Sequence, residues 1–230
     1  MSYSLAAVAN KFDLVIIQQY LKQITNYGSF RANLDADIKT TGNFNDRENI
    51  SGSGNFAIND FHFGKTPTED FASFKKLKVS IHRLSPKNHI YEYDSISLNT
   101  PFIKYERYDY LDNIQTMFGA DGSNITAVQG SGKFNLVIEI AEYIKVLAKN
   151  LFKSDYKFDR IAVYNADIRY NDYTLNEKFS IALNPLTVTA DSVDKNRKRV
   201  KVNLHAGILP YGRVDIGLNI NPKDSSDFEL

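Results

Sequence analysis

The sequence predicts a mainly β protein of the α+β class: a long twisted antiparallel sheet, or groove, built from two related units, each with a helix packed on its apolar face. Three observations lead to this prediction. Apolar and polar residues alternate with a period of two over most of the 230 residues, as in strands with one wet and one covered face. Residues 94–105 recur at 159–170, with an offset of 65 residues and no gap. Only two stretches show the periodicity of a long amphipathic helix.

The internal repeat consists of alternating apolar positions rather than acids, bases or metal ligands. A unit that recurs inside one chain suggests that one strand pair was built twice and stacked. The repeat therefore describes architecture and says nothing direct about chemistry. The aligned positions are Asp94 with Asp159, Ile96 with Ile161, Leu98 with Val163, Ile103 with Ile168, Lys104 with Arg169 and Tyr105 with Tyr170.

The helical periodicity predicts a first helix over 13–25 and a second over 135–152, with a short third helix over 111–118. Asp13 and Asn135 are the candidate N-caps of the two longer helices, because short polar side chains accept hydrogen bonds from free backbone N–H groups. The second helix is expected to bury one apolar stripe, made of Leu136, Ile140, Tyr143, Ile144, Leu147 and Leu151.

Alternation predicts the strands, several of them ten residues long or more. The parity of one strand switches between Ile58 and Phe61, which predicts a bulge near Asn59–Asp60. Pro185 interrupts another strand, which then resumes. The last two strands are expected to pair across a Leu-Pro-Tyr-Gly turn. Besides the repeat, the predicted strands cover 30–38, 56–63, 77–81, 179–183, 186–190, 200–204 and 214–220.

The domain organisation predicted from composition is one segment, 1–230, with two internal halves. The Gly- and Ser-rich stretch 119–132 is the candidate linker between the halves 1–118 and 133–230. The chain ends on SSDFEL, which resembles the start of a further strand. No signal peptide opens the chain, and no apolar run reaches the roughly 18–20 residues that a membrane span needs. We therefore expect a segment excised from a longer protein.

Composition excludes several classes of function. The 28 Lys and Arg residues balance 27 Asp and Glu residues, which argues against a nucleic-acid partner recruited by bulk positive charge. The absence of Cys excludes disulfide, zinc-thiolate and thiol chemistry. Zero Cys is compatible with the cytosol and with the periplasm, so it decides neither.

The motifs that resemble catalytic or ligand sites lack the residues that such sites need. GSGK at 130–133 has Ala127 and Phe134 where a phosphate-binding loop needs Gly and Ser or Thr. The four histidines lack metal-ligand spacing, and His62 and His82 are expected to face solvent. No Ser lies in the context of a catalytic nucleophile. We therefore expect a non-enzymatic protein with no catalytic residue, no metal and no cofactor.

Two charged or aromatic stretches each leave two interpretations open. The tract KNRKRVK at 195–201 is either a charged hairpin tip or a contact for anionic lipid head groups and lipopolysaccharide phosphates. The aromatic stretch YERYDY at 105–110 holds either cross-strand pairs on a sheet surface or side chains that stack on sugars or bases. The residues expected to contact anionic head groups are Lys195, Arg197, Lys198 and Arg199.

The stretch 156–222 resembles the AsmA-like superfamily of Gram-negative envelope proteins, which includes relatives of AsmA and TamB. The resemblance rests on FDRIAVYNADIRYNDYTLNEKFSIALNPLTV followed by VNLHAGILPYGRVDIGLNINP. A degenerate first copy, SGSGNFAINDFHFG with YDSISLNTPFIKYERYDY, precedes it. The resemblance implies a β groove with an apolar inner face, in a periplasmic protein anchored in the inner membrane. It also implies a role in moving phospholipid or in outer-membrane biogenesis, with no catalytic residues.

Our first hypothesis is therefore a lipid-handling groove whose partners are phospholipid or lipopolysaccharide. Because burying one methylene is worth about 0.8 kcal/mol, an acyl chain needs no specific polar contact. The same alternation also fits an ordinary closed core. The second hypothesis is a structural scaffold or protein-interaction module that binds no lipid and pairs with neighbouring segments of the full-length protein. The expected groove-lining residues are Ile96, Leu98, Ile103, Ile161, Val163, Ile168, Val202, Leu204, Ile216 and Leu218.

Overall fold

The computed structural model describes residues 1–151 and 153–230, with the side chains of all of these except Arg47 and Ser225. Strands make up 62% and helices 20% of the chain, which confirms the predicted mainly β fold. The elements are β1 (Ser2–Asp13), α1 (Ile16–Ile24), β2 (Ser29–Asn43), β3 (Asp46–Thr66), β4 (Glu69–Ser85), η1 (Pro86–Asn88), β5 (Ile90–Asn99), β6 (Phe102–Arg107), α2 (Asn113–Phe118), η2 (Ala120–Gly122), α3 (Ser123–Gly130), α4 (Leu136–Leu151), β7 (Asp155–Asp172), β8 (Phe179–Asp194), β9 (Val200–Leu209), β10 (Gly212–Asn221) and β11 (Asp224–Glu229).

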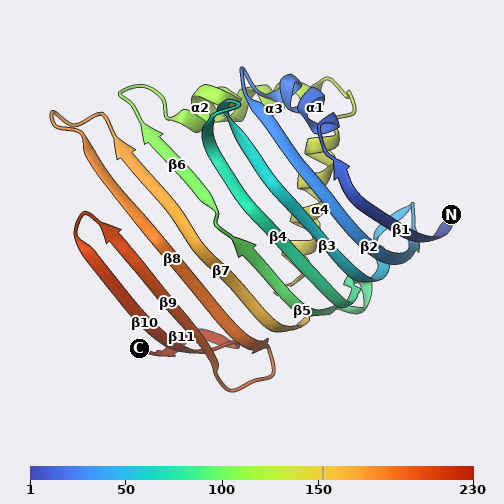
Figure 1. The fold of residues 1–230 in the computed structure, drawn as a ribbon. Coiled ribbons are helices and arrows are strands. Elements are labelled where there is room, and N and C mark those ends of the chain that lie inside the picture. The colour runs from blue at the N-terminus through green and yellow to red at the C-terminus, as the bar shows by residue number, and fades with distance from the viewer. Residues whose placement is uncertain (152) are drawn as a thin grey trace.

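All described strands belong to a single sheet in the order β1-β2-β3-β4-β5-β7-β8-β9-β10-β11, and β6 continues β5 between β4 and β7 (Figure 1). Neighbouring strands are antiparallel except at the centre, where β7 runs parallel to β5 and β6. The sheet is therefore mixed, whereas the sequence predicted an antiparallel one. The reason is the long connection through α2, α3 and α4, because parallel neighbours need a crossover rather than a tight turn.

The two copies of the repeat lie side by side, and the register of their pairing equals the offset of the repeat. Ile96 pairs with Ile161 and Ile103 pairs with Ile168. Both copies are extended, and both are interrupted at the same place by a residue with positive φ, Thr100 (50°) and Asn165 (53°). The two copies therefore share their conformation, as the repeat predicted.

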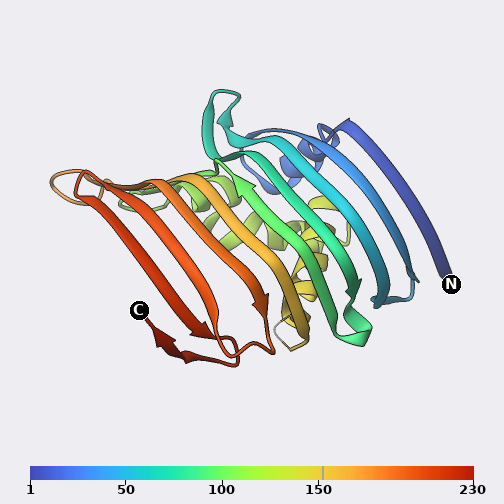
Figure 2. The ribbon, with the colours of Figure 1, turned by 60° about the horizontal axis from the view of Figure 1, so that its bottom comes forward.

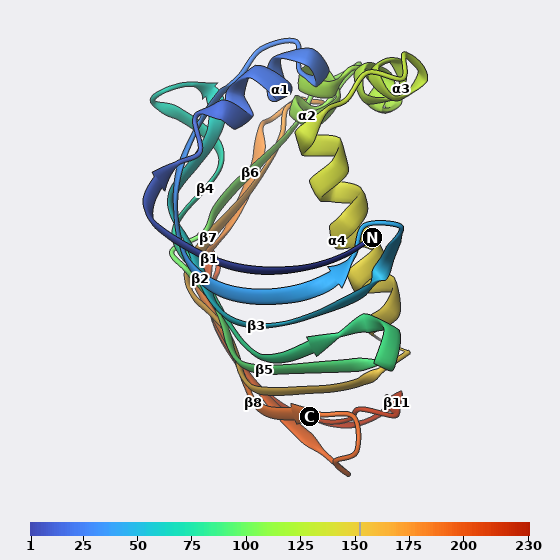
Figure 3. The same ribbon diagram turned by 90° about the vertical axis from the view of Figure 1, so that its right-hand side faces the viewer.

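A line of irregularities, which we call the crease, crosses the sheet and bends it. Lys11 and Asp60 also have positive φ, at 48° and 50°. The register shifts between Ala9 and Phe12 on β1 and between Arg31 and Asn33 on β2. This confirms the bulge predicted near Asn59–Asp60, and bulges increase the local bend and twist of a strand. The resulting sheet is curved, with α4 on its concave side (Figure 3). We call the side that faces α4 the concave face and the opposite side the convex face.

The helices α1, α2 and α4 confirm the three helices predicted from the sequence, and only the predicted N-cap of α1 is wrong. The Asn135 side chain caps α4 by accepting hydrogen bonds from the N–H groups of Val137 (3.0 Å) and Ile138 (3.2 Å). Asp13 instead ends β1, a strand that the prediction missed, and its carboxylate accepts from the N–H of Val15 (2.9 Å). The candidate linker 119–132 contains η2 and α3.

The position of the helices leaves the concave face partly uncovered. α4 crosses this face behind β2–β5, and α1, α2 and α3 lie at one end of the strands (Figure 1). In the described part of the chain, no helix lies over the concave side of β9 and β10 (Figures 1 and 2). The stripe of α4 is not fully buried as expected, because Ile140 and Ile144 are 43% and 58% exposed.

The accessible surface also shows that the sheet is not closed into a core. It amounts to 14101 Å², about a third more than the ~10,600 Å² expected for a compact monomer of this mass. The fully buried cluster is small and lies on β7, β8 and β9: Ala166, Leu186 and Ala206. Most other apolar side chains are only half-buried.

The paired interruptions of the repeat give a reciprocal test of backbone strain. A β-branched residue is disfavoured at positive φ, whereas Asn tolerates it. Thr100→Asn is therefore expected to raise the free energy of unfolding by about 1 kcal/mol, and Asn165→Thr to lower it by about as much. Urea unfolding measures both changes. Changes of the same sign in the free energy of unfolding of both variants would contradict the assignment of backbone strain to Thr100.

Candidate functional site

Two rows of apolar side chains cross the concave face from β2 to β10, perpendicular to the strands. Each row consists of residues that are direct register partners on neighbouring strands, so their side chains point to the same face of the sheet. The first row is Ala36, Phe56, Val79, Ile96, Ile161, Ala190, Val202 and Leu218. The second row is Leu34, Ile58, Leu77, Leu98, Val163, Val188, Leu204 and Ile216.

The structure places the predicted groove-lining residues in or beside these rows. The first row contains Ile96, Ile161, Val202 and Leu218, and the second contains Leu98, Val163, Leu204 and Ile216. Ile103 and Ile168 pair with each other beyond the crease, where Ile168 packs on the buried cluster and Ile103 is 48% exposed.

The sequence reasoning missed the central part of this surface. Leu186 pairs with Ala166 on one side and with Ala206 on the other, which places the fully buried cluster next to the second row. Alternation after Pro185 already marked Leu186, but small alanines carry little hydrophobic signal. The rows and this cluster together form a continuous apolar surface.

An aromatic cluster on β5 and β7 lies beside Tyr143 of α4. The rings of Tyr93 and Phe158 stack with centroids 4.9 Å apart, and Tyr91 is 1% exposed. Among the described residues, the hydroxyls of Tyr91 and of Tyr143 on α4 are buried with no hydrogen-bond partner. Burial is the main cause that raises the pKa of Tyr91 to about 12, and the nearby Tyr93, Glu48 and Tyr143 add to it. The cluster therefore presents a mostly apolar surface with two neutral hydroxyl groups.

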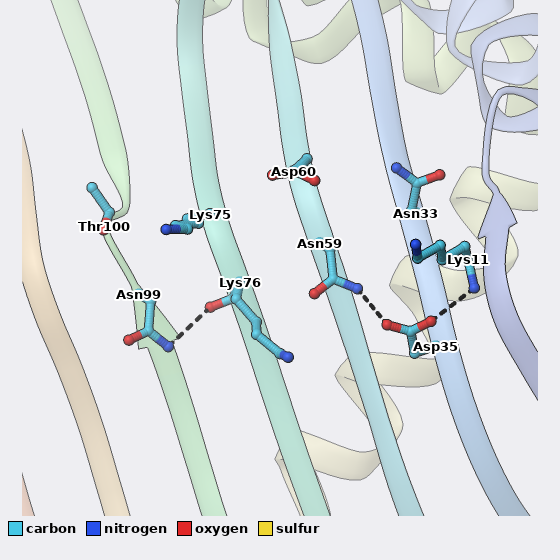
Figure 4. Close-up of a pocket in the computed structure, with 9 residues that line it drawn as sticks. All are labelled: Lys11, Asn33, Asp35, Asn59, Asp60, Lys75, Lys76, Asn99 and Thr100. Atoms are coloured by element: carbon cyan, nitrogen blue, oxygen red, sulfur yellow. Dashed lines mark hydrogen bonds between the residues drawn. The ribbon is translucent and has the colours of Figure 1, made fainter.

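The convex face carries a polar depression of about 790 Å³, lined by nine residues (Figure 4). In Figure 4 these side chains lie in front of the sheet and the helix passes behind it. Asp35 accepts hydrogen bonds from the N–H of Lys11 (2.7 Å) and from Asn59 (2.8 Å), which hold the pKa of this carboxyl below its usual range. The lining residues are Lys11, Asn33, Asp35, Asn59, Asp60, Lys75, Lys76, Asn99 and Thr100.

The carboxylates of the depression do not form the pair that a glycosidase-like site uses. Its carboxylates, Asp35 and Asp60, lie among lysines, and an Asp whose pKa is lowered is not a proton donor near neutral pH. A glycosidase-like site needs one carboxyl group with a raised pKa opposite a second carboxylate. No group of three or more His, Cys, Asp or Glu side chains that could hold a metal occurs in the described part of the chain.

His62 is a correction to the sequence prediction, because its side chain is only 1% exposed. Its Nδ1 contacts the Asp70 carboxylate and its Nε2 lies 3.0 Å from the carbonyl oxygen of Thr66. Alternation predicted the face of the sheet correctly, but the turn between β3 and β4 covers the ring. Gly64 permits this approach, because a Cβ there would lie 2.9 Å from Cε1 of His62. His82 faces solvent as expected, with its side chain 69% exposed.

The basic tract 195–201 lies at the hairpin tip between β8 and β9, as the first interpretation predicted. Lys195 donates to the carbonyl oxygens of Lys153 (3.4 Å) and Ser154 (3.1 Å). Arg199 pairs with Asp227 (2.8 Å) and Glu229 (3.6 Å) of β11. Lys195 and Arg199, two of the four residues expected to contact head groups, therefore bind partners within the chain. No ion pair of Arg197 or Lys198 occurs among the described residues.

The aromatic stretch 105–110 makes cross-strand pairs, the first of its two interpretations. Tyr105 stacks on Tyr170 with ring centroids 5.9 Å apart, and Tyr108 stacks on Tyr173 at 5.2 Å. Tyr110 is 95% exposed.

No helix in the described part of the chain has the length and apolarity needed to cross a membrane.

Comparison with protein-family models, with curated proteins and with solved structures found no match to this chain. The functional conclusion therefore depends on the geometry of the chain itself.

The raised pKa of Tyr91 predicts a loss of stability in alkali. The folded protein keeps this phenol neutral up to about pH 12, whereas the unfolded chain ionises it near pH 10.0. The contribution is fully present below pH 10.0 and disappears as the pH rises toward about 12. Urea unfolding between pH 9 and pH 12 should therefore show a falling free energy of unfolding, with a weaker slope in Tyr91→Phe.

Two comparisons control this measurement. At neutral pH, Tyr91→Phe should be neutral or stabilising, because it removes a buried hydroxyl that lacks a partner. Tyr110→Phe, at a position that is 95% exposed, should leave the slope in alkali unchanged. An equal slope in Tyr91→Phe and the wild type would contradict the assignment.

Proposed function

We propose that this chain is a non-enzymatic segment of a Gram-negative envelope protein that binds the acyl chains of phospholipid or lipopolysaccharide on its concave face. The observation that carries the proposal is the pair of apolar rows, which continue over eight strands and are only half-buried, except at Val79. An ordinary core would bury such side chains more completely. A soluble monomer rarely leaves an extended apolar surface without a partner.

The direction of the rows fits an elongated apolar ligand. Neighbouring strands are about 4.8 Å apart, so a chain that lies along a row meets one apolar side chain per strand. Burying about ten methylenes contributes roughly 8 kcal/mol before the cost of ordering the ligand. Such binding is non-directional and needs no buried polar group. Arg197 and Lys198 at the hairpin tip, which have no ion pair among the described residues, would attract the anionic end of the ligand.

The uncovered part of the concave face is the proposed contact surface. α4 covers β2–β5, whereas β9 and β10 have no helix over them in the described part of the chain (Figure 1). We place the ligand over Val202 on β9 and Leu218 on β10, which are register partners. The resemblance to AsmA-like proteins supports a periplasmic location in a longer protein anchored in the inner membrane, with neighbouring segments continuing the apolar surface.

A scaffold that binds no lipid is the second candidate function. It is favoured by the two free edges of the sheet, β1 and β11, each of which pairs with a single neighbour among the described strands. The two candidates differ in the content of the purified protein. Lipid that co-purifies with the protein and is seen by native mass spectrometry supports the first, and its absence supports the second.

A charge on the concave face of β9 tests the proposed contact directly. Val202→Asp is expected to lower the amount of bound lipid at least about tenfold, because it replaces about 1.5–3 kcal/mol of apolar contact by a desolvated carboxylate. Native mass spectrometry and binding of a fluorescent fatty acid measure the effect. Asn203→Asp is the matched control, since it adds the same charge one residue away on the convex face.

A milder variant keeps the test valid when the carboxylate disturbs folding. Val202→Thr preserves the shape of the side chain and replaces one methyl group by a hydroxyl, so it should weaken lipid binding less than Val202→Asp does. Far-ultraviolet circular dichroism identifies variants that keep the sheet. Equal lipid binding by folded Val202→Asp and Asn203→Asp would refute the proposal.

A further inference from the structure

Most of the edge strand β1 lacks the features that normally keep an edge from pairing with another chain, because its charges, Lys11 and Asp13, and its bulge, between Ala9 and Phe12, lie at one end. It is twelve residues long and, in the described structure, pairs only with β2. Residues 2–10, SYSLAAVAN, carry no charged side chain and no Pro. Leu5 and Val8 are 52% and 80% exposed. Natural proteins usually protect such an edge with charges, Pro, a bulge or a covering element.

The opposite edge of the sheet is protected in several of these ways. β11 is only six residues long and its register with β10 is irregular. It carries Asp224, Asp227 and Glu229, so two copies of β11 would bring like charges together. Asp227 and Glu229 are also engaged by Arg199. Of the two edges, β1 is therefore the one that is available for pairing with another chain.

We infer that two copies of this chain associate through β1, which pairs antiparallel with β1 of the second copy around a two-fold axis. Such an interface is self-complementary, and the uncharged segment 2–10 can be paired with itself without opposing like charges. Pairing over nine residues supplies roughly nine backbone hydrogen bonds, within the range of a typical protein–protein interface. Little apolar surface is buried at an edge, so the dimer is expected to be weak and reversible.

The geometry of this pairing joins the concave faces of the two copies. Directly opposed residues in an antiparallel pair point to the same face of the sheet. Ala9 and Ala7, the partners of Ala36 and Ile38, would therefore lie on the same side as their counterparts. The apolar rows would continue from one copy into the other. The inference does not depend on whether that face binds lipid.

Sedimentation velocity over a range of protein concentrations tests the association. The wild type is expected to shift with concentration from the mass of one chain, 26.1 kDa, toward twice that value. A single species of one-chain mass at about 1 mM, where an association worth ~4 kcal/mol would be half complete, overturns the inference.

A charged side chain on the edge should prevent the association without harming the monomer. Val8→Lys places an ammonium opposite Asp37 of β2, its register partner, and gives the edge strand a charge of the kind that natural edges use against pairing. The variant is expected to weaken dimerisation at least about tenfold. Thr41→Lys on β2 adds the same charge one strand further in and should dimerise like the wild type. Equal dimerisation of Val8→Lys and Thr41→Lys refutes β1 as the interface.

Because the chain contains no Cys, single cysteines locate the contact. Ala6→Cys, near the centre of the uncharged segment, is expected to form a disulfide-linked dimer under mild oxidation. Ser226→Cys on β11 should not. A dimer that cross-links through position 226 and not through position 6 contradicts the inference.

Discussion

The parallel, in-register pairing of β7 with β5 and β6 joins the two antiparallel halves of the molecule into one sheet. Both apolar rows pass through this pairing, at Ile96–Ile161 and Leu98–Val163. A slip by one residue would turn the apolar side chains of one half to the other face of the sheet. The repeat prevents such a slip, because equal spacing in both strands makes the native register the one in which every apolar position meets another.

Much of this fold follows from local sequence patterns. Alternation found the strands from Phe30 onward and the bulge near Asp60, and helical periodicity found α4 with its Asn135 cap. Alternation did not find β1, because its alanines and serines give weak contrast between the two faces. The parallel pairing was also missed, since its hydrogen bonds join residues 65 positions apart and leave no local signal. The glycines of 119–132 concealed α3, which contacts α1 and α2.

Local sequence patterns also predict the candidate site only in part. The repeat and the period of two identified side chains that share the concave face, but they carry no information on what covers it. The position of α4 over β2–β5 depends on contacts at its ends, where Asn135 donates to the carbonyl oxygen of Tyr20 (3.0 Å) and Asn150 to Glu48 (3.0 Å). Arg199 was expected to face an anion outside the chain. It instead pairs with Asp227 and Glu229 of β11. Local sequence patterns carry no information that β11 folds back to Arg199.

The crease has a consequence for how such a molecule can grow. Thr100 and Asn165 occupy equivalent positions of the two copies and have nearly equal φ, 50° and 53°. The interruption therefore recurs with the repeat, at the same position of each copy. A chain with additional copies of the unit would gain length along the row direction while keeping the same cross-section. The concave face would thus lengthen by identical sections, each with the same curvature as the first.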